Sequence, residues 1–545
     1  MGENNPNIVK EYFKTNFLSD LKAGFITSVV ALPLAIAFAI ASGVPPIMGL
    51  YTAIIAGILG SAIGGSKFSI TGPTGAMSVI ILSTVNKFGL EGLLLAGLLA
   101  GIFQILFGII RLGKSVKYIP LPVIVGFTAG IGAIIFIGQI GNAFGLSLPP
   151  EEHVWQTIYD VFLNLSKTSY TALSIYLFTI LVLMFAPKYL SKIKFTKNIP
   201  PSIIALTLSS LIVFLFAINV PVVGEITKGI PAFKIISFNW ALLRNVLPAA
   251  FTIALLGAIE ALLCAVVCDG MTGTRHKSDK ELISQGISNV VLPFFGGIPC
   301  TAAIARSAVN IREGARTRMA GIIHALFLLL IVLFFAQLAF YIPKAFLAGI
   351  LMVVSIRMFN FNEIKLISKS GKQDLLVLIV TFSFTVLTDL VLAVQVGMLL
   401  SIFLIFVRLM QISSIKSMED YDPRGEFNSL LNSNIALKDK VSIYTIHGPF
   451  FFGVINLFEE KLTEHMYLER PVIILRMKHV PFIDSSGLVQ LMGFIKERKK
   501  KNSRVIFTEF WPGLKEKLMK NSEFAKLVSN KDIFKTVNQA LDSLK

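Results

Sequence analysis

About fourteen apolar runs, separated by Gly, Pro and charged clusters, follow one another along the first three quarters of the chain. They lie near 23–44, 47–64, 71–86, 90–110, 119–145, 170–187, 200–219, 245–268, 282–296, 300–312, 318–340, 343–358, 373–389 and 391–409. A transmembrane helix needs about 20 apolar residues, because the hydrocarbon core is about 30 Å thick and each helical residue rises about 1.5 Å. Since 54% of all residues are hydrophobic and only 15% are charged, this pattern predicts a polytopic α-helical membrane protein.

Two short segments within these runs, 71–82 and 300–311, hold corresponding places in the two hydrophobic halves of the chain. Neither is long enough to cross a membrane, so each is predicted to be a half-helix that begins inside it. A helix N-terminus carries unpaired N–H groups and a partial positive charge, and irregular backbone at that depth is tolerated only beside a cavity or inside protein. Two such N-termini that face each other form an anion site. Because paired breaks are typical of secondary transporters, the sequence predicts a secondary anion transporter.

The basic residues predict how the chain crosses the membrane. The first apolar stretch follows Lys10, Lys14 and Lys22 and has no signal-peptide cleavage pattern, so the N-terminus is expected in the cytoplasm. The loops that would then face inward are the basic ones, as the positive-inside rule requires; they hold Arg111, Lys114, Lys117, Lys188, Lys192, Lys194, Lys197, Arg275, Lys277, Lys280, Arg312, Arg316, Arg318, Lys365, Lys369 and Lys372. An even number of crossings returns the C-terminus to the cytoplasm. The protein is expected in the cytoplasmic (inner) cell membrane. Topology thus explains the net charge of +18, and no nucleic-acid partner is expected.

The expected domains follow from this pattern. Residues 1–19 form an N-terminal cytoplasmic segment, and 20–410 form the transmembrane domain, with one repeat at about 20–220 and a second at about 245–410. Seven segments in each half place the two repeats in opposite orientation, because an odd number inverts the second copy. Residues 411–438 are polar and read as a linker. Beyond it, strand-like runs at 441–446, 472–475 and 505–508 alternate with helical patterns at 452–462, 487–498 and 532–544, which predicts a small α/β domain over 439–545.

Two charged residues lie inside apolar segments. Glu260 is more than two turns from any other charge of its predicted helix, and intramembrane acids usually mark an ion or proton path. Two readings stay open: proton or cation coupling, and a structural partner for Arg306. Arg306 lies a few residues into the second half-helix, where its guanidinium can bind an oxyanion, neutralise Glu260 or raise the local potential.

Smaller residues complete the candidate site. Gly72, Pro73 and Gly75 allow close approach of the backbone and start a helix. The hydroxyls of Thr71, Thr74, Thr301 and Ser307 can reach a ligand or cation, or bond back to their own helix. Phe38 offers an apolar wall or ordinary packing.

Other chemistry is not expected. Three cysteines are too few for a disulfide framework, Cys264 and Cys268 read as small packing residues, and no metal cluster or pair of nucleophile and base is evident, so neither a metal site, a cofactor nor an enzyme is predicted. In the C-terminal domain, Asp484-Ser485-Ser486-Gly487 lies between a strand and a helix. Asp484 or Ser485 would cap that helix whatever its function, and Ser486 is a candidate regulatory phosphosite.

Several motifs in one order resemble the SulP family of anion transporters. They are the stretch from Leu32-Pro33 through Phe38 to Tyr51, Thr71-Gly-Pro-Thr-Gly-Ala76, Gly257-Ala-Ile-Glu260 and Phe295-Gly-Gly-Ile-Pro-Cys-Thr-Ala-Ala-Ile-Ala-Arg306-Ser. The tail, with its Asp-Ser-Ser-Gly, is similar to STAS domains and to bacterial anti-sigma-factor antagonists, in which Ser486 matches the phosphosite. The resemblance covers nearly the whole chain.

This resemblance implies a core of segments 1–4 and 8–11, a gate of segments 5–7 and 12–14, an elevator-like movement of the core, and a homodimer. It places the anion between the half-helices, at Thr74, Gly75 and Ala76 on one side and Ala305 and Arg306 on the other, with Phe38 lining the pocket. A glutamate at position 260 resembles proton-coupled members, whereas the sodium-coupled bicarbonate branch tends to carry Asp there.

The leading hypothesis is therefore proton-coupled uptake of sulfate, bicarbonate or a dicarboxylate across a lipid bilayer. A second hypothesis is sodium-dependent bicarbonate transport. A third is an anion-sensing membrane protein that signals to a cytoplasmic partner through its STAS domain.

Overall fold

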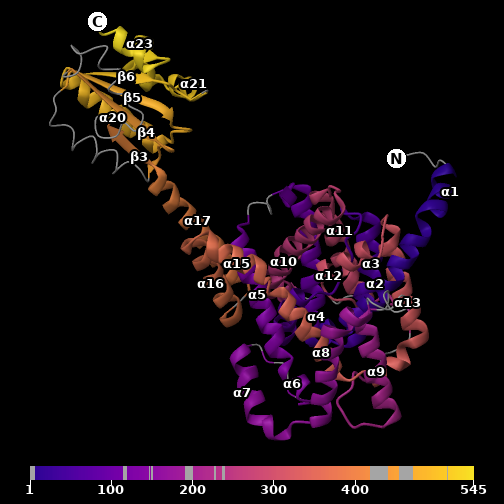
Figure 1. Ribbon diagram of the computed structural model, residues 1–545. Coiled ribbons are helices and arrows are strands. Elements are labelled where there is room, and N and C mark those ends of the chain that lie inside the picture. Colours follow the sequence, from indigo (N-terminus) through magenta and orange to yellow (C-terminus); the bar gives the residue numbers. More distant parts are fainter. Residues whose placement is uncertain are drawn as a thin grey trace. The chain divides into compact units, whose positions relative to one another are not determined.

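The computed structural model describes residues 6–114, 119–146, 148, 151, 153–190, 200–225, 229–235, 240–388, 390–417, 440–452, 470–511 and 513–545 (Figure 1). The chain divides into two compact units, Met1–Leu399 and Leu400–Lys545. In its described residues, the first unit is helical apart from two strands of two residues each, and the second is built on a five-stranded sheet.

The helices of the first unit are mostly apolar and long. They are α1 (Pro6–Thr15), α2 (Phe17–Ala41), α3 (Pro46–Ile63), α4 (Gly75–Ile109), α5 (Leu121–Gly138), α6 (Ile140–Ala143), α7 (Val154–Asn164), α8 (Tyr170–Leu190), α9 (Pro201–Leu215), α10 (Trp240–Thr272), α11 (Ser278–Val291), α12 (Ile304–Arg312), α13 (Met319–Phe335), α14 (Lys344–Met358), α15 (Phe361–Ser370) and α16 (Lys372–Leu387), followed by α17 (Leu390–Ile412), which continues into the second unit. In the described part of the chain, seven helices are long and apolar enough to cross a membrane, or eight if the bent pair α7 and α8 counts as one span. The remaining expected segments are shorter: α9, α11, α13 and α16 have 15, 14, 17 and 16 residues, and α12 has nine.

Some breaks were expected and others were not. The runs 71–86 and 90–110 meet at Gly89, whose φ of 70° and ψ of −176° interrupt α4 between two helical parts. A helix at α7 was not predicted, because its apolar residues alternate with polar ones and the run is too short to span. It exposes Trp155 and Phe162.

Two short strands lie at the start of the predicted half-helices. β1 (Thr71–Gly72) pairs antiparallel with β2 (Thr301–Ala302), with Thr71 opposite Ala302 and Gly72 opposite Thr301. The predicted helix starts at Thr71 and Cys300 were therefore wrong by a few residues, because α4 begins at Gly75 and α12 at Ile304. The physical reason is that the backbone groups of each extended segment find partners in the other half of the chain, which no local pattern reveals.

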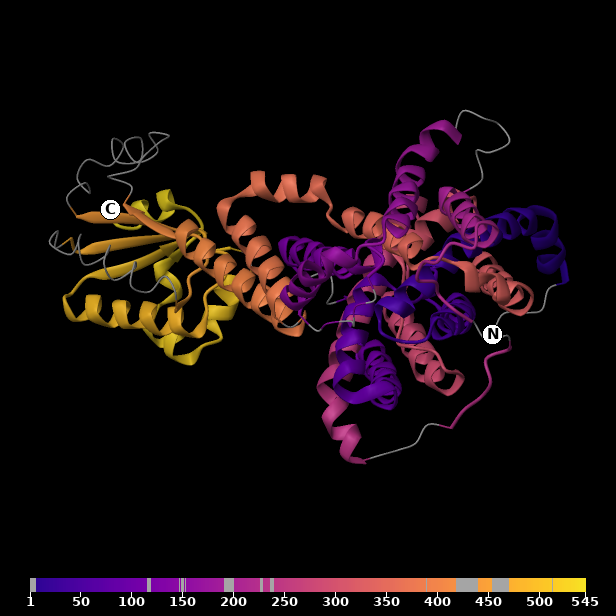
Figure 2. The same ribbon diagram turned by 90° about the horizontal axis from the view of Figure 1, so that it is seen from below.

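The helices of the first unit pack in two groups. In one, α4 packs against α10 and α11, and α13 packs against α2 and α3. In the other, α5 packs against α14 and α16, and α14 against α8. Figure 2 shows indigo helices from the start of the chain beside salmon helices from the second half, in line with the packing of α13 against α2 and α3. The grouping follows the division into core and gate segments that the family resemblance implies.

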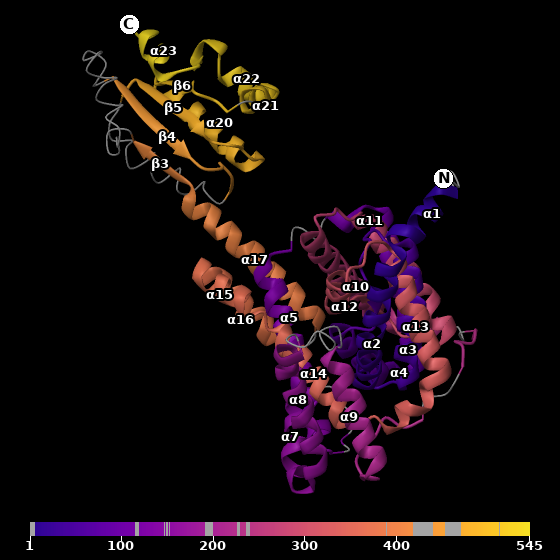
Figure 3. The same ribbon diagram turned by 45° about the vertical axis from the view of Figure 1, so that its right-hand side comes forward.

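The second unit has the strand order β3-β4-β5-β6-β7. The elements are β3 (Ser414–Ser417), β4 (Val441–His447), β5 (Val472–His479), β6 (Arg504–Thr508), β7 (Ile533–Phe534), α20 (Ser485–Lys500), α21 (Leu514–Met519), α22 (Ser522–Leu527) and α23 (Val537–Asp542). β3 is antiparallel to β4 and the other pairs are parallel. Figure 3 shows α20, α21 and α22 on one side of this sheet.

The predicted strands and the helix at 487–498 are confirmed in this unit. Residues 414–417 of the expected linker form β3 instead, while 418–438 and most of the predicted helix 452–462 lie outside the described residues. The predicted helix 532–544 begins only at Val537, because Ile533 and Phe534 pair with β6.

Candidate functional site

The N-terminus of α4 lies at the centre of the candidate site. Thr74 has extended backbone, with φ −128° and ψ 162°, and its hydroxyl oxygen accepts the N–H of Met77 at 3.3 Å as an N-cap. Gly75 must be small here, since a Cβ would lie 2.8 Å from Cδ1 of Ile135 and 3.2 Å from Cε1 of Phe38. The structure thus brings Phe38 against the first turn of α4, where the sequence placed an apolar wall.

Glu260 lies on α10 and contacts this helix start directly. The hydroxyl of Thr74 donates to Oε2 of Glu260 at 2.8 Å. The carboxyl group is half-buried, and no ion pair joins it to Arg306, although both residues are described. Of the two readings left open by the sequence, a direct structural pair with Arg306 is not what the structure shows.

Arg306 is held by backbone instead. Its side chain is 1% exposed, and its Nη2 donates to the carbonyl oxygen of Pro73. Its Nη1 has no hydrogen-bond partner. The guanidinium lies against Gly72, where a Cβ would be 2.5 Å from Nη1. A fully buried guanidinium with a spare donor thus lies beside the strand that leads into α4, while Ala305, at the start of α12, is exposed.

The remaining predicted hydroxyls are engaged by neighbouring helices. The hydroxyl oxygen of Thr71 accepts from Nε2 of Gln285 at 3.0 Å, and the hydroxyl of Thr301 donates to the carbonyl of Gly257 at 2.7 Å. Ser307 accepts the N–H of Ile70 at 2.8 Å and donates to the carbonyl of Ala303. Contact of Thr71 or Thr301 with an anion stays a prediction, as does that of Ala76, which is buried in the first turn of α4.

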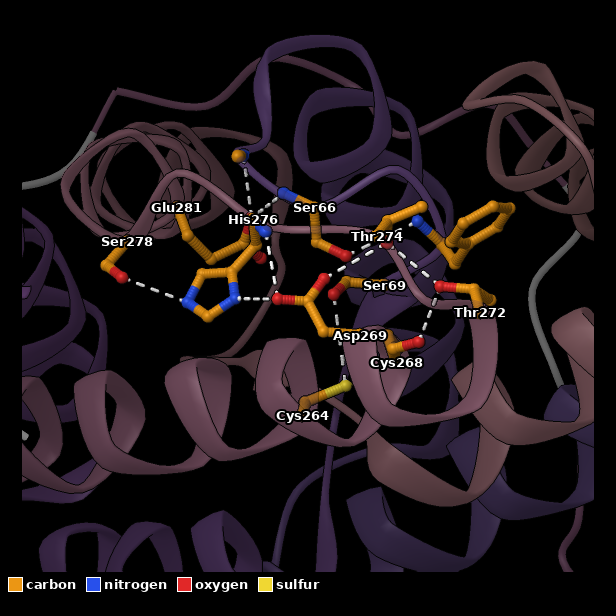
Figure 4. Close-up of polar contacts among 12 residues, drawn as sticks. Ser66, Ser69, Cys264, Cys268, Asp269, Thr272, Thr274, His276, Ser278 and Glu281 are labelled. Carbon is orange, nitrogen blue, oxygen red and sulfur yellow. Dashed lines mark hydrogen bonds and ion pairs between the residues drawn. The ribbon is translucent and has the colours of Figure 1, made fainter. Parts of the chain in front are cut away.

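A row of buried polar side chains on α11 supports both strands. Glu281 accepts the N–H groups of Gly65 and Ser66 at 2.7 and 2.8 Å (Figure 4), and its other oxygen accepts from Gln285 at 3.1 Å. The amide of Gln285 donates to the hydroxyl oxygen of Thr71, the first residue of β1. One turn on, Asn289 accepts the N–H of Cys300 at 2.8 Å and donates to the Cys300 carbonyl at 3.0 Å, just before β2.

These α11 residues were missed from the sequence. The run 282–296 looked like one more apolar segment, yet Glu281, Gln285 and Asn289 recur every four residues on one helical face. A polar stripe of that period in a membrane segment is the signal that would have found them. In the described residues no group of three or more His, Cys, Asp or Glu side chains could hold a metal ion.

A cavity of about 810 Å³ lies between the two groups of helices. Its walls include Ser78 and Asn245 from α4 and α10, and Ile135 and Lys344 from α5 and α14. Ser78 is one turn beyond Thr74, and Ile135 touches the position of Gly75, so the cavity ends next to the start of α4.

In the second unit, Asp484 is the N-cap of α20 and accepts the N–H of Gly487 at 2.7 Å. Ser486 is exposed in the first turn of this helix. A phosphate group on that hydroxyl would lie at a helix N-terminus, where negative charge is favoured. Modification of Ser486 stays a prediction.

Two broken helices that meet at paired strands, with a buried arginine and an intramembrane acid beside them, define the membrane domain of an anion transporter. The chain belongs to the sulfate permease family: the model of that family matches residues 17–381, and the STAS domain model matches residues 432–540. The SulP and STAS resemblances are thereby confirmed, and with them the conclusion that the protein is a transporter and not an enzyme.

Similar proteins cover most of the chain. YvdB of Bacillus subtilis (strain 168) is 37% identical over 524 residues, which are 95% of this chain and 96% of YvdB. The bicarbonate transporter BicA of Picosynechococcus sp. is 31% identical over 507 residues, 90% of this chain and 88% of BicA. The solved transmembrane domain of a cyanobacterium bicarbonate transporter BicA is 34% identical with a TM-score of 0.63, covering 71% of this chain and 98% of that one. The structure of SLC26A9 shares the fold, with a TM-score of 0.84 at 18% identity over 97% of this chain and 91% of that one.

Proposed function

We propose that this protein is a proton-coupled symporter that takes up a small oxyanion, namely sulfate, bicarbonate or a dicarboxylate. The observation that carries the proposal is the hydrogen bond between the hydroxyl of Thr74 and the carboxyl group of Glu260. It joins the N-terminus of a half-helix, where an anion is favoured, to the one acid in the membrane part of α10.

The anion would lie between the starts of α4 and α12. Both helix ends present N–H groups there, and Arg306 adds a full positive charge from its buried position. Its unpartnered Nη1 is a donor that an oxyanion can satisfy. Phe38 and Ile135, which contact the position of Gly75, would exclude water from one side of the bound ion.

Glu260 would carry the proton. An anion and a deprotonated Glu260 next to each other repel, whereas an anion and a protonated Glu260 do not, so the two ligands favour binding together. When the site opens to the cytoplasm, loss of the proton restores the negative charge and expels the anion. The coupling ion in this scheme is H⁺, and no other cofactor is needed.

Movement between the two groups of helices would give alternating access. α11 and the β1–β2 pair tie the half-helices into one group, so the whole site would move as a body against α5, α14 and α16, as in an elevator. We place the protein in the inner cell membrane with both termini in the cytoplasm, as a homodimer, with a STAS domain that can bind a cytoplasmic partner.

Sodium-dependent bicarbonate transport is the second candidate, because two relatives at 31% and 32% identity are named as bicarbonate transporters. In that case the carboxylate of Glu260 and the hydroxyl oxygen of Thr74 would be ligands of Na⁺.

Uptake by the full-length protein in proteoliposomes distinguishes the candidates. Labelled sulfate, bicarbonate and succinate are supplied with an inward proton gradient, in choline or in sodium buffer at the same pH. Accumulation of one anion in choline that disappears without the proton gradient supports proton symport. Accumulation that requires sodium supports the second candidate. If none of the three anions accumulates in either buffer, both proposals are contradicted and the anion-sensing hypothesis takes their place.

A further inference from the structure

Polar and ionisable side chains continue along α10 from Glu260 toward the end of the helix. Cys264 follows Glu260 by four residues and Cys268 by eight, so their side chains form a column on one face of α10. Asp269, the residue after Cys268, lies at the end of this column. Cys264 and Cys268 are completely buried, and Asp269 is 20% exposed. The column spans about 13 Å at about 1.5 Å per residue, from the candidate site to one end of the unit.

Hydroxyl groups from two other segments line this column. The thiol of Cys264 is 3.2 Å from the hydroxyl oxygen of Ser307 on α12 and 3.9 Å from that of Ser69, in the segment before β1. Figure 4 shows Cys264, Ser69 and Asp269 in succession. Side chains one turn apart on a helix lie about 5–6 Å from each other at Cβ, an interval that one hydrogen-bonded water can bridge.

A chain of three hydrogen-bonded residues closes the column. Asp269 Oδ2 is 2.7 Å from Nδ1 of His276, and Nε2 of His276 is 2.9 Å from the hydroxyl of Ser278. Thr274 donates to Asp269 Oδ1 at 3.1 Å (Figure 4). The His276 side chain is only 7% exposed, but Asp269 reaches solvent.

Both acidic and basic residues surround the pair of Asp269 and His276. Glu281 on α11 interacts electrostatically with His276. Arg275 and Lys277 flank His276 along the chain, while Asp279 is engaged by the N–H of Gly113 at 3.1 Å. The carboxylate of Asp269 and the imidazole of His276, which lie 2.7 Å apart, are thus the acid and base groups at the end of the column.

We propose that Asp269 and His276 form the exit station for the proton that Glu260 carries, an inference that rests on the proton coupling proposed above. The O–H bond of Glu260 breaks and leaves a carboxylate, each hydroxyl, thiol or water on the way accepts one proton and passes on another, and the Asp269–His276 pair gains one proton, which it then gives to bulk water. No electrons are exchanged. The direction agrees with release into the cytoplasm, because the loop after α10 lies at the same end of the unit as α1 (Figures 1 and 3).

Two assays on the full-length protein test this route. Net uptake driven by an inward proton gradient requires Glu260 to lose its proton in every cycle. Counterflow, the exchange of labelled for unlabelled anion at equal pH on both sides, lets the loaded carrier return with its proton still bound. We expect Asp269→Asn and His276→Gln to slow net uptake about tenfold, as for a lost proton-transfer group, and to leave counterflow unchanged. Asp279→Asn, in the first turn of α11 but outside the column, is the matched control and should behave as wild type in both assays.

Four results decide the matter. Slow net uptake with normal counterflow in both variants supports the exit station. An equal loss of both activities, in protein that still elutes as a folded species, shows that Asp269 and His276 only hold the loop in place and overturns it. Normal net uptake in both variants, together with loss of net uptake in Glu260→Gln, overturns the station but keeps the coupling. Normal net uptake in Glu260→Gln itself removes the proposed coupling and the exit station with it.

Discussion

The hydroxyl of Thr74 lies 2.8 Å from the carboxyl oxygen of Glu260, so that the residue that caps α4 also holds the acid of α10. The two residues are 186 positions apart in the chain and come from its two halves. A displacement of either helix would change this bond. It is therefore the point at which binding of an anion at the half-helix and the protonation state of the acid can affect each other.

Substitution of Thr74 by valine tests this bond. The variant keeps the shape of the side chain but loses the bond to Glu260 and the cap on Met77, and loss of an N-cap costs about 1 kcal/mol. We expect a lower Tm in detergent and slower proton-driven uptake. Thr74→Ser keeps the hydroxyl and should keep most of both. Thr128→Val, which removes a hydroxyl that bonds only within α5, is the control. A serine variant as impaired as the valine variant would contradict a role for the hydroxyl.

A methyl group at Gly72 should displace Arg306. The added Cβ would lie 2.5 Å from Nη1 and 3.2 Å from Cζ, and backbone pairing with β2 prevents the strand from moving away. If the guanidinium attracts the anion, Gly72→Ala should raise the KM for the anion about tenfold, the effect of roughly 1.4 kcal/mol. Gly270→Ala, where the added Cβ meets no atom within 4 Å, should leave the KM unchanged. Equal KM values for the two variants would remove Arg306 from the binding site.

Loss of the Gln285 amide should destabilise the membrane unit. Gln285→Leu leaves the buried hydroxyl of Thr71 and one oxygen of Glu281 without their donor, which costs about 1–3 kcal/mol for a buried polar group. Thermal unfolding of the purified protein should show a clearly lower Tm than for Gln411→Leu, where the glutamine is exposed. Similar Tm values would mean that the α11 row does not support the strands.

Removal of the Asp484 cap should affect the STAS domain. Its carboxylate accepts the N–H groups of Gly487 and Phe452 at 2.7 and 3.2 Å, so Asp484→Ala is expected to cost about 1 kcal/mol. Proteolysis of the full-length protein should then cleave the C-terminal domain faster, while Ser485→Ala should resemble wild type. Unchanged cleavage of the Asp484 variant would contradict the capping role.

Local patterns carried much of the fold. The apolar runs, the break at Gly89 and the strand at Val441–His447 depend on residues close in sequence, and the structure has them where they were expected. The motif around Pro73 predicted a helix start within a few residues of the observed one, because a proline at a helix N-terminus is a local signal, whereas the cap at Thr74 was not predicted.

The contacts of the site were less predictable. A structural pair with Arg306 was one of two readings of Glu260 that the sequence left open, since opposite charges in a membrane usually pair. The carbonyl of Pro73 takes that place because β1 is extended and leaves this oxygen without a helical partner. β1 pairs with β2, which lies more than two hundred residues away in the sequence, so no local window contains both strands. Their supports, Gln285 and Asn289, lie within a run that looks apolar.

The central claim is that Glu260 carries a proton with each anion. The most direct measurement is the internal pH of proteoliposomes, reported by an enclosed dye, when the transported anion is added outside without any imposed gradient. Wild-type protein should acidify the interior as the anion enters, and Glu260→Gln should show no acidification while anion counterflow continues. Acidification at the wild-type rate in the Glu260→Gln variant would contradict the claim.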